Sequence, residues 1–518
     1  MPSGAPIVTS ICSECGASVE FELGALQVKC THCDAGLAVD KGLRLVRLSC
    51  PRCSGNFYYI DGSMCGKCPY CDAQLLAVSH DRLLRYVVLP AQQQPEEARG
   101  ATLVLLPFWH LSGLVYGWDI GSKVEIEEDR ATISGDAQRD SQPMPTTTRK
   151  DSGPMKVFRG RVVDLSIPDP ATLAVGVTSL RLRGAIFPLE PFSAGHESLG
   201  RLTPATLDVA RAREQLCGRA LRKAQAGDGL TQLDIQRQDL VAETFSLFYY
   251  PFWLREGVCP AGGEGQTGGV SAWDGVSGLP EPLAPGAPAP AHGASTAFDD
   301  LQIIELVCGA CNQPLHGGNR STVLPCTSCG AVWQVGRDGL RPFPASWAKP
   351  QLPGPRLVWL PFWRMDVRVS YRGSEAATVG ALRALLGITR APGETPSAPE
   401  SSPLGYYAPA FGALKAPRLD FAARDMTRTQ PRLEPFVPVK EGSEVYNCFY
   451  DPVDAQRLAY TTWIGLLPGT AVKALRSLRI DVGPAALWYV PFDNRGRELV
   501  NLLTGIRYDW AAFRGVRH

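Results

Sequence analysis

The sequence predicts an α+β fold with internal duplication, in which each of two related halves places a small cysteine-rich module before a mainly antiparallel β-sheet domain with a few helices. One extra cysteine-rich module is expected at the amino terminus. Three observations support this prediction: cysteine pairs recur at one constant spacing, an apolar phrase centred on Pro-Phe occurs four times, and most segments show the alternation of strands.

The cysteine spacing predicts three zinc ribbons. Twelve of the sixteen cysteines form Cys-x-x-Cys pairs, which combine into three sets with fourteen residues between the two pairs of each set. Each pair presents two thiolates from one tight turn, and four thiolates complete a tetrahedral Zn²⁺ shell with no open position, so three structural sites are expected. The predicted ligands are Cys12, Cys15, Cys30 and Cys33, then Cys50, Cys53, Cys68 and Cys71, and finally Cys308, Cys311, Cys326 and Cys329.

Two alternatives stay open for these cysteines, namely buried free thiols and an iron or redox site. Cys65 also stands at pair spacing from Cys68, but the constant interval selects Cys68 with Cys71 and leaves Cys65 as a spectator or an alternate ligand. The residue after every pair is a turn former, as a tight ligand turn requires. These residues are Gly16, Asp34, Ser54, Asp72, Asn312 and Gly330.

The repeated phrase predicts strands that fill two equivalent cores. It reads LVLLPFWHL at residues 103–111, LFYYPFWL at 247–254, LVWLPFWRM at 357–365 and LWYVPFD at 487–493. Because proline removes a ladder donor, these runs are expected to be edge strands or to carry a bulge. The aromatic residues after the prolines are expected in the core, and the alternative is a set of exposed platforms that stack on nucleic acid or a peptide.

The order of the remaining segments completes the two halves. Residues 363–371 alternate apolar and polar side chains and predict a strand with one solvated face. A helix is expected from an N-cap at Thr203, and residues 416–420 are expected to be the counterpart of residues 203–208. The predicted units are ribbons at 1–40 and 41–80, a domain at 81–278, a Pro/Ala/Gly-rich linker at 279–298, a ribbon at 299–340 and a domain at 341–518.

Composition narrows the function classes. The net charge of +1 gives no overall field that would attract nucleic acid or anionic lipid. The start of the chain lacks the pattern of a signal peptide, and no apolar run reaches the roughly 20 residues of a membrane span, so a reducing, cytoplasmic location is expected. A phosphate-binding loop, a His-Glu-x-x-His motif and a Gly-x-Ser-x-Gly motif are all missing, and no catalytic residue is predicted.

The cysteine pairs resemble the rubredoxin-knuckle zinc ribbons of general transcription factors, RNA polymerase subunits and replication-restart helicases. This likeness covers modules of about 25 residues, and no helicase motor accompanies them. More of the chain resembles a loosely defined group of uncharacterised bacterial proteins in which tandem ribbons precede Pro-Phe-Trp strands, here Pro107-Phe108-Trp109 and Pro361-Phe362-Trp363. That resemblance implies the architecture of ribbons followed by sheet domains.

The leading hypothesis is a non-catalytic, zinc-binding scaffold or adaptor whose ribbons bind another protein, so that no enzyme activity is predicted. A second hypothesis is binding of single-stranded nucleic acid through the ribbons and nearby basic residues. These residues are Lys29, Lys41, Arg44, Arg47 and Arg52. A third is an enzyme with an unrecognised pocket between the halves, and the oligomeric state is left open.

Overall fold

The computed structural model confirms a mainly β chain with few helices and several sheets. It describes residues 7–509 except 12–17, 23–26, 30–35, 39–43, 61–64, 79–82, 91–93, 130–145, 152–154, 178–186, 226–229, 231, 257–269, 282–300, 319, 337–338, 389–396, 413–415, 438–443 and 468–471. We call the residues before 282 the first half and those after 300 the second half. Most of the predicted linker at 279–298 lies outside the described residues. All four cysteines of the predicted ribbon at 1–40 lie outside them as well.

The described residues of the first half contain a large sheet, two α-helices and two short 3-10 helices. Its strands are β1 (Ile7–Ile11), β2 (Ser18–Glu22), β3 (Gln27–Lys29), β4 (Gly36–Ala38), β5 (Arg44–Ser49), β6 (Asn56–Ile60), β7 (Cys65–Lys67), β8 (Gln74–Val78), β9 (Leu84–Val88), β10 (Thr102–Ser122), β11 (Val124–Asp129), β12 (Thr146–Asp151), β13 (Met155–Pro168), β14 (Phe187–Pro191), β15 (Arg201–Leu202), β16 (Gln232–Glu256), β17 (Val270–Asp274) and β18 (Pro280–Glu281). The helices are η1 (Glu96–Ala98), α1 (Pro170–Ala174), η2 (Ala194–Ser198) and α2 (Val209–Gln225).

The second half has a smaller sheet and more helix. Its strands are β19 (Gln302–Glu305), β20 (Val323–Pro325), β21 (Val332–Gly336), β22 (Gly339–Pro342), β23 (Ala345–Trp347), β24 (Leu357–Tyr371), β25 (Ser374–Ala376), β26 (Gly405–Pro409), β27 (Glu444–Val445), β28 (Arg479–Asn494), β29 (Glu498–Asn501) and β30 (Arg507–Asp509). The helices are α3 (Val379–Leu386), α4 (Ala416–Thr429), α5 (Pro452–Leu466) and α6 (Val472–Arg476).

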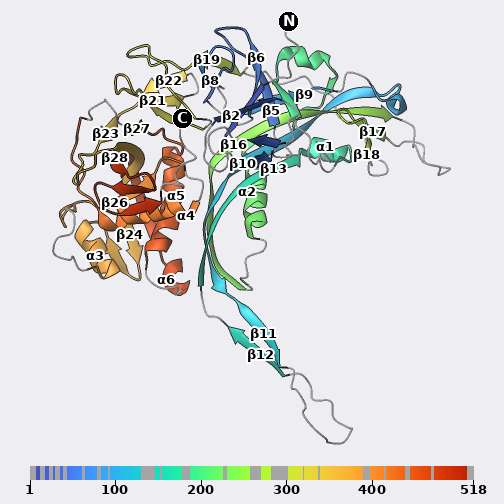
Figure 1. The fold of residues 1–518 in the computed structure, drawn as a ribbon. Helices are drawn as coiled ribbons and strands as arrows, with labels where there is room; N and C mark the ends of the chain where they lie inside the picture. The colour runs from blue at the N-terminus through green and yellow to red at the C-terminus, as the bar shows by residue number, and fades with distance from the viewer. Residues whose placement is uncertain are drawn as a thin grey trace, which may run out of the picture.

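Three long strands, β13, β10 and β16, form one end of the large sheet, which continues through β9, β14, β5, β6, β1 and β2. They curve through the middle of the molecule, and the β11–β12 hairpin extends beyond them (Figure 1). Alternate side chains of β10 face different cores. Trp109 and Val115 share a core with Leu216 of α2, whereas on the other face Phe108 joins a core of the first half and Tyr116 and Ile120 join residues of the second half. Around residues 115–120 the long strands are therefore covered by α2 on one face and by the second half on the other.

The two halves pair their strands in the same register around the repeated phrase. Pro107 lies opposite Tyr249 in the β10–β16 ladder, and Pro361 lies opposite Tyr489 in the β24–β28 ladder. Short strands lie parallel to β10 and β24 at matching places, where Leu105 meets β15 and Trp359 meets β27. Each long ladder also shifts register a few residues after its proline, and the β10–β16 ladder shifts a second time between Ile120 and Gly121.

The repeated phrases lie in central strands and not at sheet edges, whereas the other expectation, a bulge, is met by the register shift in each long ladder. The carbonyl oxygen of Pro107 accepts the N–H of Asp169 just beyond the end of β13, and that of Pro361 accepts the N–H of Ala410 just beyond the end of β26. Since N and O of a strand residue point to the same side, each proline nitrogen faces a place where the outer strand has ended. The missing donor therefore interrupts no ladder.

The prediction that the aromatic residues after the prolines lie in the core is confirmed. Five of these six aromatic residues are buried, and Trp253 is half-buried. The buried residues are Phe108, Trp109, Phe252, Phe362 and Trp363. Burial alternates along residues 363–371 as predicted.

The helix expected from Thr203 begins later, at Val209. Thr203 instead donates its N–H to Leu105 O and extends the pairing of β15, while Asp208 accepts the N–H of Arg211 at the start of α2. The expected correspondence between residues 416–420 and 203–208 stays a prediction. In chain order α2 precedes the closing long strand β16 and α5 precedes β28, whereas α4, which contains residues 416–420, comes before β27.

The two halves share core and hydrogen bonds. Trp118 Nε1 donates to Thr461 O at 3.1 Å, and Lys156 Nζ donates to Ile464 O at 2.8 Å, so both long strands bind α5. The bulge of β16 is held at Ala242, whose N–H donates to Asp454 and whose carbonyl accepts Arg320. Elements expected in separate units thus form one continuous body, and strands of the predicted ribbon at 41–80 also run in the large sheet.

Candidate metal centres

Two of the three predicted cysteine sets come together as four-thiol clusters that could hold a metal ion. The clusters are Cys50, Cys53, Cys68 and Cys71, and Cys308, Cys311, Cys326 and Cys329, with all Sγ atoms of each within 4.8 Å of one another. Two Sγ pairs lie 3.7 Å apart in the first cluster, and two lie 3.5 Å apart in the second. A tetrahedral zinc ion with Zn–S bonds of about 2.3 Å requires a separation of about 3.8 Å between sulfurs. Both clusters therefore fit a ribbon-type Zn²⁺ site.

The same backbone turn builds all four ligand pairs. In each pair the N–H four residues after the first cysteine donates to the carbonyl of that cysteine, as from Ser54 to Cys50 at 2.9 Å and from Asn312 to Cys308 at 2.8 Å. The donor residue has a positive φ in every turn, 58° at Ser54, 59° at Asp72, 58° at Asn312 and 77° at Gly330. These four residues are turn formers that tolerate a left-handed backbone, so this part of the sequence prediction is confirmed.

Hydrogen bonds favour the thiolate at the first cysteine of the second cluster. Burial opposes ionisation of Cys308, but the backbone N–H groups of Ala310 and Cys311 and the neighbouring thiol and indole groups outweigh it and lower the pKa of Cys308 to about 6. Trp333 Nε1 donates to Cys308 Sγ at 3.2 Å. Trp333 lies so close to Gly309 that a Cβ there would be 2.6 Å from the ring, so glycine is required under the indole. Sequence reasoning missed Trp333, whose position in β21 directly follows the last ligand turn.

Cys65 is not a member of the cluster that its spacing suggested. It is fully buried in a small core shared by the two ribbons, and burial raises the pKa of Cys65 to about 12. That core includes Leu76 from β8 and Leu306 and Leu315 from beside the second cluster. A thiol that stays protonated in an apolar setting is a packing group, so the spectator interpretation is supported.

The two cysteine clusters lie on segments that pair with each other across more than two hundred residues of sequence. Strand β19 pairs antiparallel with β8, so that Ile304 lies opposite Leu76. Arg52, in the first ligand turn, donates to both carboxylate oxygens of Glu305 at 3.0 and 2.9 Å. The ribbons at 41–80 and 299–340 therefore form one composite module, which the spacing of cysteines could not predict because the pairing joins distant segments.

The basic residues proposed for nucleic-acid binding are partly engaged within the protein. Arg52 forms the bidentate pair with Glu305, and Arg47 lies 3.4 Å from Glu190. Lys29 is exposed, Arg44 lies on β5, and Lys41 is outside the described residues. Outside the predicted ligand sets, Cys448 is buried and Cys217 is half-buried.

A Ser-His-Glu arrangement near β14 is explained by helix capping. Ser193 donates its backbone N–H to His196 Nδ1 at 3.0 Å, so Nε2 carries the ring proton and donates to Glu190 at 3.2 Å. The Ser193 side chain in turn accepts the backbone N–H of His196, which completes a capping box at the start of η2. These contacts satisfy the helix end and supply no further group for a reacting substrate.

A cavity that the sequence did not predict lies in the second half. It has a volume of about 260 Å³ and is lined by residues of α3, α4, α5 and the β29–β30 turn, and not by both halves. The described helices include none long and apolar enough to cross a membrane.

By their geometry, the two cysteine clusters could each hold a metal ion in a zinc-ribbon-like way. Comparison with known proteins adds no relative, because no protein-family model, no curated protein and no solved structure matches the chain.

Proposed function

We propose that the protein is a zinc-binding, non-catalytic scaffold whose ribbons act as structural staples and as a docking module for another protein. The observation that carries this proposal is the pair of closed four-thiol clusters docked to each other through β8 and β19. Four thiolates leave no position for a substrate or a reactive water, so a metal held there serves structure.

The composite ribbon module offers a rigid surface away from the sheets. Tyr70, in a ligand turn, is 55% exposed, and its hydroxyl is anchored to Asn56 O at 3.0 Å. Pro51 and Ala310 are exposed at the tips of two other turns. A fixed aromatic side chain beside exposed apolar turns is a common form of protein-binding anchor, since little conformational entropy is lost on docking.

The finer architectural predictions belong to this proposal. The equal strand register around Pro107 and Pro361 supports an internal duplication, in which the ribbon at 299–340 is the counterpart of the ribbon at 41–80. The spacing of Cys12, Cys15, Cys30 and Cys33 supports an extra ribbon and a third Zn²⁺ site. The wealth of thiols supports a reducing compartment such as the cytoplasm.

Binding of single-stranded nucleic acid remains an untested alternative. It has less support than protein binding, because Arg47 and Arg52 are paired with carboxylates and the chain has a net charge of only +1. Saturable binding of an oligonucleotide that weakens steeply with salt would favour this alternative over the scaffold.

Zinc content and partner binding test the proposal together. Purified protein is expected to contain three zinc ions per chain, two of them in the clusters described above. Affinity purification from the native host should retain one specific partner protein on the wild type, and Tyr70→Ser should lose it while keeping its zinc. Val437→Ser, which changes a side chain 86% exposed elsewhere in the second half, should keep both.

Two results would contradict the scaffold proposal. Fewer than two zinc ions per chain would show that the clusters are not metal sites. Equal partner recovery by wild type and Tyr70→Ser would show that the ribbon module is not the docking surface.

A further inference from the structure

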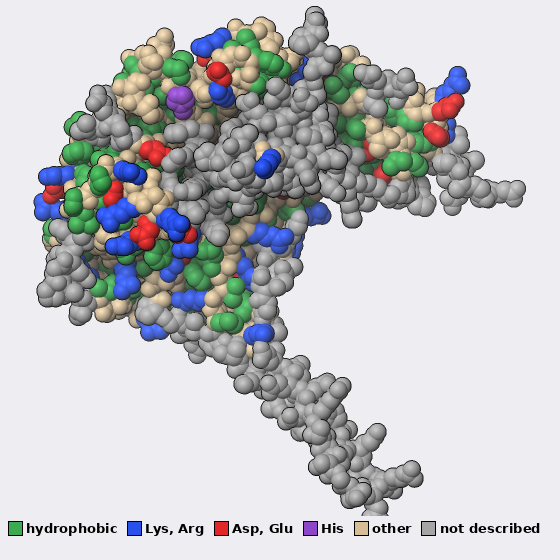
Figure 2. All heavy atoms as spheres, viewed as in Figure 1, with side chains coloured by type: hydrophobic (Ala, Val, Ile, Leu, Met, Phe, Trp, Pro, Cys, Tyr) green, Lys and Arg blue, Asp and Glu red, His purple; other side chains and the backbone are tan. Residues whose placement is uncertain are grey.

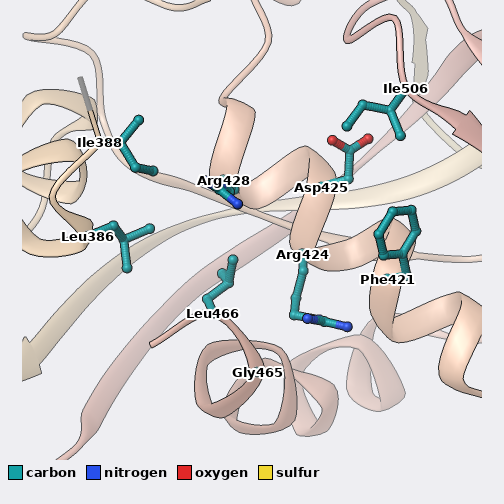
Figure 3. A pocket seen from close by; sticks show the side chains of 9 residues that line it. All are labelled: Leu386, Ile388, Phe421, Arg424, Asp425, Arg428, Gly465, Leu466 and Ile506. Carbon is teal, nitrogen blue, oxygen red and sulfur yellow. The ribbon is translucent and has the colours of Figure 1, made fainter. Parts of the chain in front are cut away.

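The cavity in the second half has the shape and chemistry of a ligand site. Its volume of about 260 Å³ is close to the lower end of small-molecule pockets, which begin near 300 Å³. Five apolar side chains form most of its wall and three charged residues of α4 complete it (Figure 3). The lining residues are Leu386, Ile388, Phe421, Arg424, Asp425, Arg428, Gly465, Leu466 and Ile506.

The acidic residue of the wall is fully occupied by the protein. Asp425 accepts hydrogen bonds from Thr429, Thr504 and Tyr508, and its carboxylate lies on the Ile506 side of α4, away from the two arginines (Figure 3). Its negative charge offsets part of the charge of Arg428, and the lining, with two arginines and one aspartate, keeps a net positive charge.

Three cationic side chains lie on or next to the part of the cavity wall formed by α4 and α5. Arg424 and Arg428 lie one helical turn apart on α4, and Lys156 of β13 binds the carbonyl oxygens of Ile464 and Leu467, which flank the α5 residues of the wall. Burial and the nearby Arg424 lower the pKa of Lys156. Figure 2 shows Lys and Arg side chains spread over this lower part of the second half.

Arg424 is held in place by a buried carboxylate, Asp420, which does not line the cavity. Its guanidinium pairs with Asp420 at 2.8 Å, and burial raises the pKa of Asp420 to about 7 despite that partner. The arginine side chain crosses Gly465, where a Cβ would lie 2.6 Å from Arg424 Cδ. Arg428 is exposed and reaches the mouth of the cavity.

We propose that this cavity binds a small amphipathic anion, with a carboxylate or phosphate head at Arg428 and Arg424 and a short apolar chain against Leu386, Ile388 and Leu466. Guanidinium groups recognise both kinds of head through charge-assisted hydrogen bonds, and the apolar wall gains from removing the chain from water. This site lies apart from both cysteine clusters and adds a binding activity to the scaffold.

Calorimetric titration of the full-length, zinc-loaded protein tests the site with octanoate, octyl phosphate, 1-octanol and inorganic phosphate. At least one of the two amphipathic anions should bind once per chain, and octanol and inorganic phosphate should each bind at least tenfold more weakly. Arg428→Gln should weaken the anion at least about tenfold, which is the loss expected for a charge-assisted hydrogen bond. The matched change Arg432→Gln, at an exposed arginine paired with Glu434 outside the cavity, should leave it unchanged.

The proposal is overturned if neither amphipathic anion saturates at millimolar concentration. It is equally wrong if octanol or inorganic phosphate binds as tightly as the better anion, or if Arg428→Gln binds that anion as tightly as the wild type does.

Discussion

At the scale of single residues, Trp333 is the group outside the ligand set that most directly supports a metal centre. Its indole N–H donates a hydrogen bond to Cys308 Sγ, and a thiolate accepts such a bond more strongly than a neutral thiol. A donor of this kind stabilises the thiolate and fixes its orientation, and loss of such an outer contact commonly costs 10- to 100-fold in metal affinity, in order of magnitude.

Trp333→Phe is therefore expected to release one zinc ion per chain at a chelator concentration about tenfold below that needed for the wild type. A colorimetric chelator titration measures this release. Trp347→Phe, at an indole that stacks on Tyr489, is the control and should match the wild type. Identical release curves for all three proteins would mean that the indole contact does not support the site.

Asp454 is a second single residue with a measurable consequence. It accepts the N–H of Ala242 at 3.0 Å across the junction of the halves, while Arg457 lies 3.9 Å away and Asp451 and Glu243 lie nearby. Burial, with repulsion from Asp451, raises the pKa of Asp454 to about 7. An unfolded aspartate ionises near pH 4, so between about 4 and 7 the folded state holds more protons and its stability falls as the pH rises.

Asp454→Asn is thus expected to lose less stability than the wild type between pH 6 and pH 8, because the amide keeps an acceptor for Ala242 and cannot ionise. Urea unfolding at the two pH values measures the difference. Asp481→Asn, on an exposed position of β28, should keep the wild-type pH dependence. If Asp454→Asn and the wild type show the same decrease, the buried carboxyl does not titrate in this range.

At the scale of elements, the bulge of β16 depends on an unusual backbone at one alanine. Ala242 has φ of 50°, in the left-handed region, and sits where the β10–β16 register shifts between Ser112 and Leu114. A β-branched side chain is especially unfavourable there. The bulge directs the N–H and carbonyl of Ala242 to the second half, so its geometry is needed for the junction.

Ala242→Val should lower the free energy of unfolding by about 1 to 3 kcal/mol, the usual cost of a strained backbone position. Ala486→Val, at an exposed position inside β28, should change it by less than about 0.5 kcal/mol. Urea denaturation of both variants provides the comparison, and a neutral effect of Ala242→Val would show that β16 can shift its register without cost.

The elements also show where sequence reasoning succeeds. Ligand turns are local, so the residue after each pair, such as Ser54 or Asn312, reports its own backbone geometry. The alternation after Trp363 is likewise local and predicted a strand correctly. The position of Pro107 in a central strand depends instead on where β13 ends, and the start of α2 depends on Thr203 pairing with Leu105, both of which are tertiary facts.

At the scale of the whole molecule, the two halves behave as parts of one body. The second half packs α5 against the long strands and shares a core with Tyr116 and Ile120, and β19 pairs with β8 near the metal centres. None of this follows from the sequence, because a Pro/Ala/Gly-rich stretch predicts only that two units are joined there. Large side chains from both halves, such as Tyr116 and Trp463, are buried, and the removal of their apolar surface from water favours a stable junction.

Cutting the chain within residues 282–300 should therefore leave the halves associated. A protease site inserted in that stretch and cleaved in the native, zinc-loaded protein is expected to give two fragments that elute together in size-exclusion chromatography. In the double variant Lys156→Glu, Asp454→Arg, the new carboxylate faces the carbonyls of Ile464 and Leu467, and the new guanidinium faces the N–H of Ala242. Both contacts are repulsive, so the cleaved fragments of this variant should separate. Separation of the cleaved wild-type fragments at micromolar concentration would show that the linker, and not the shared core, holds the halves together.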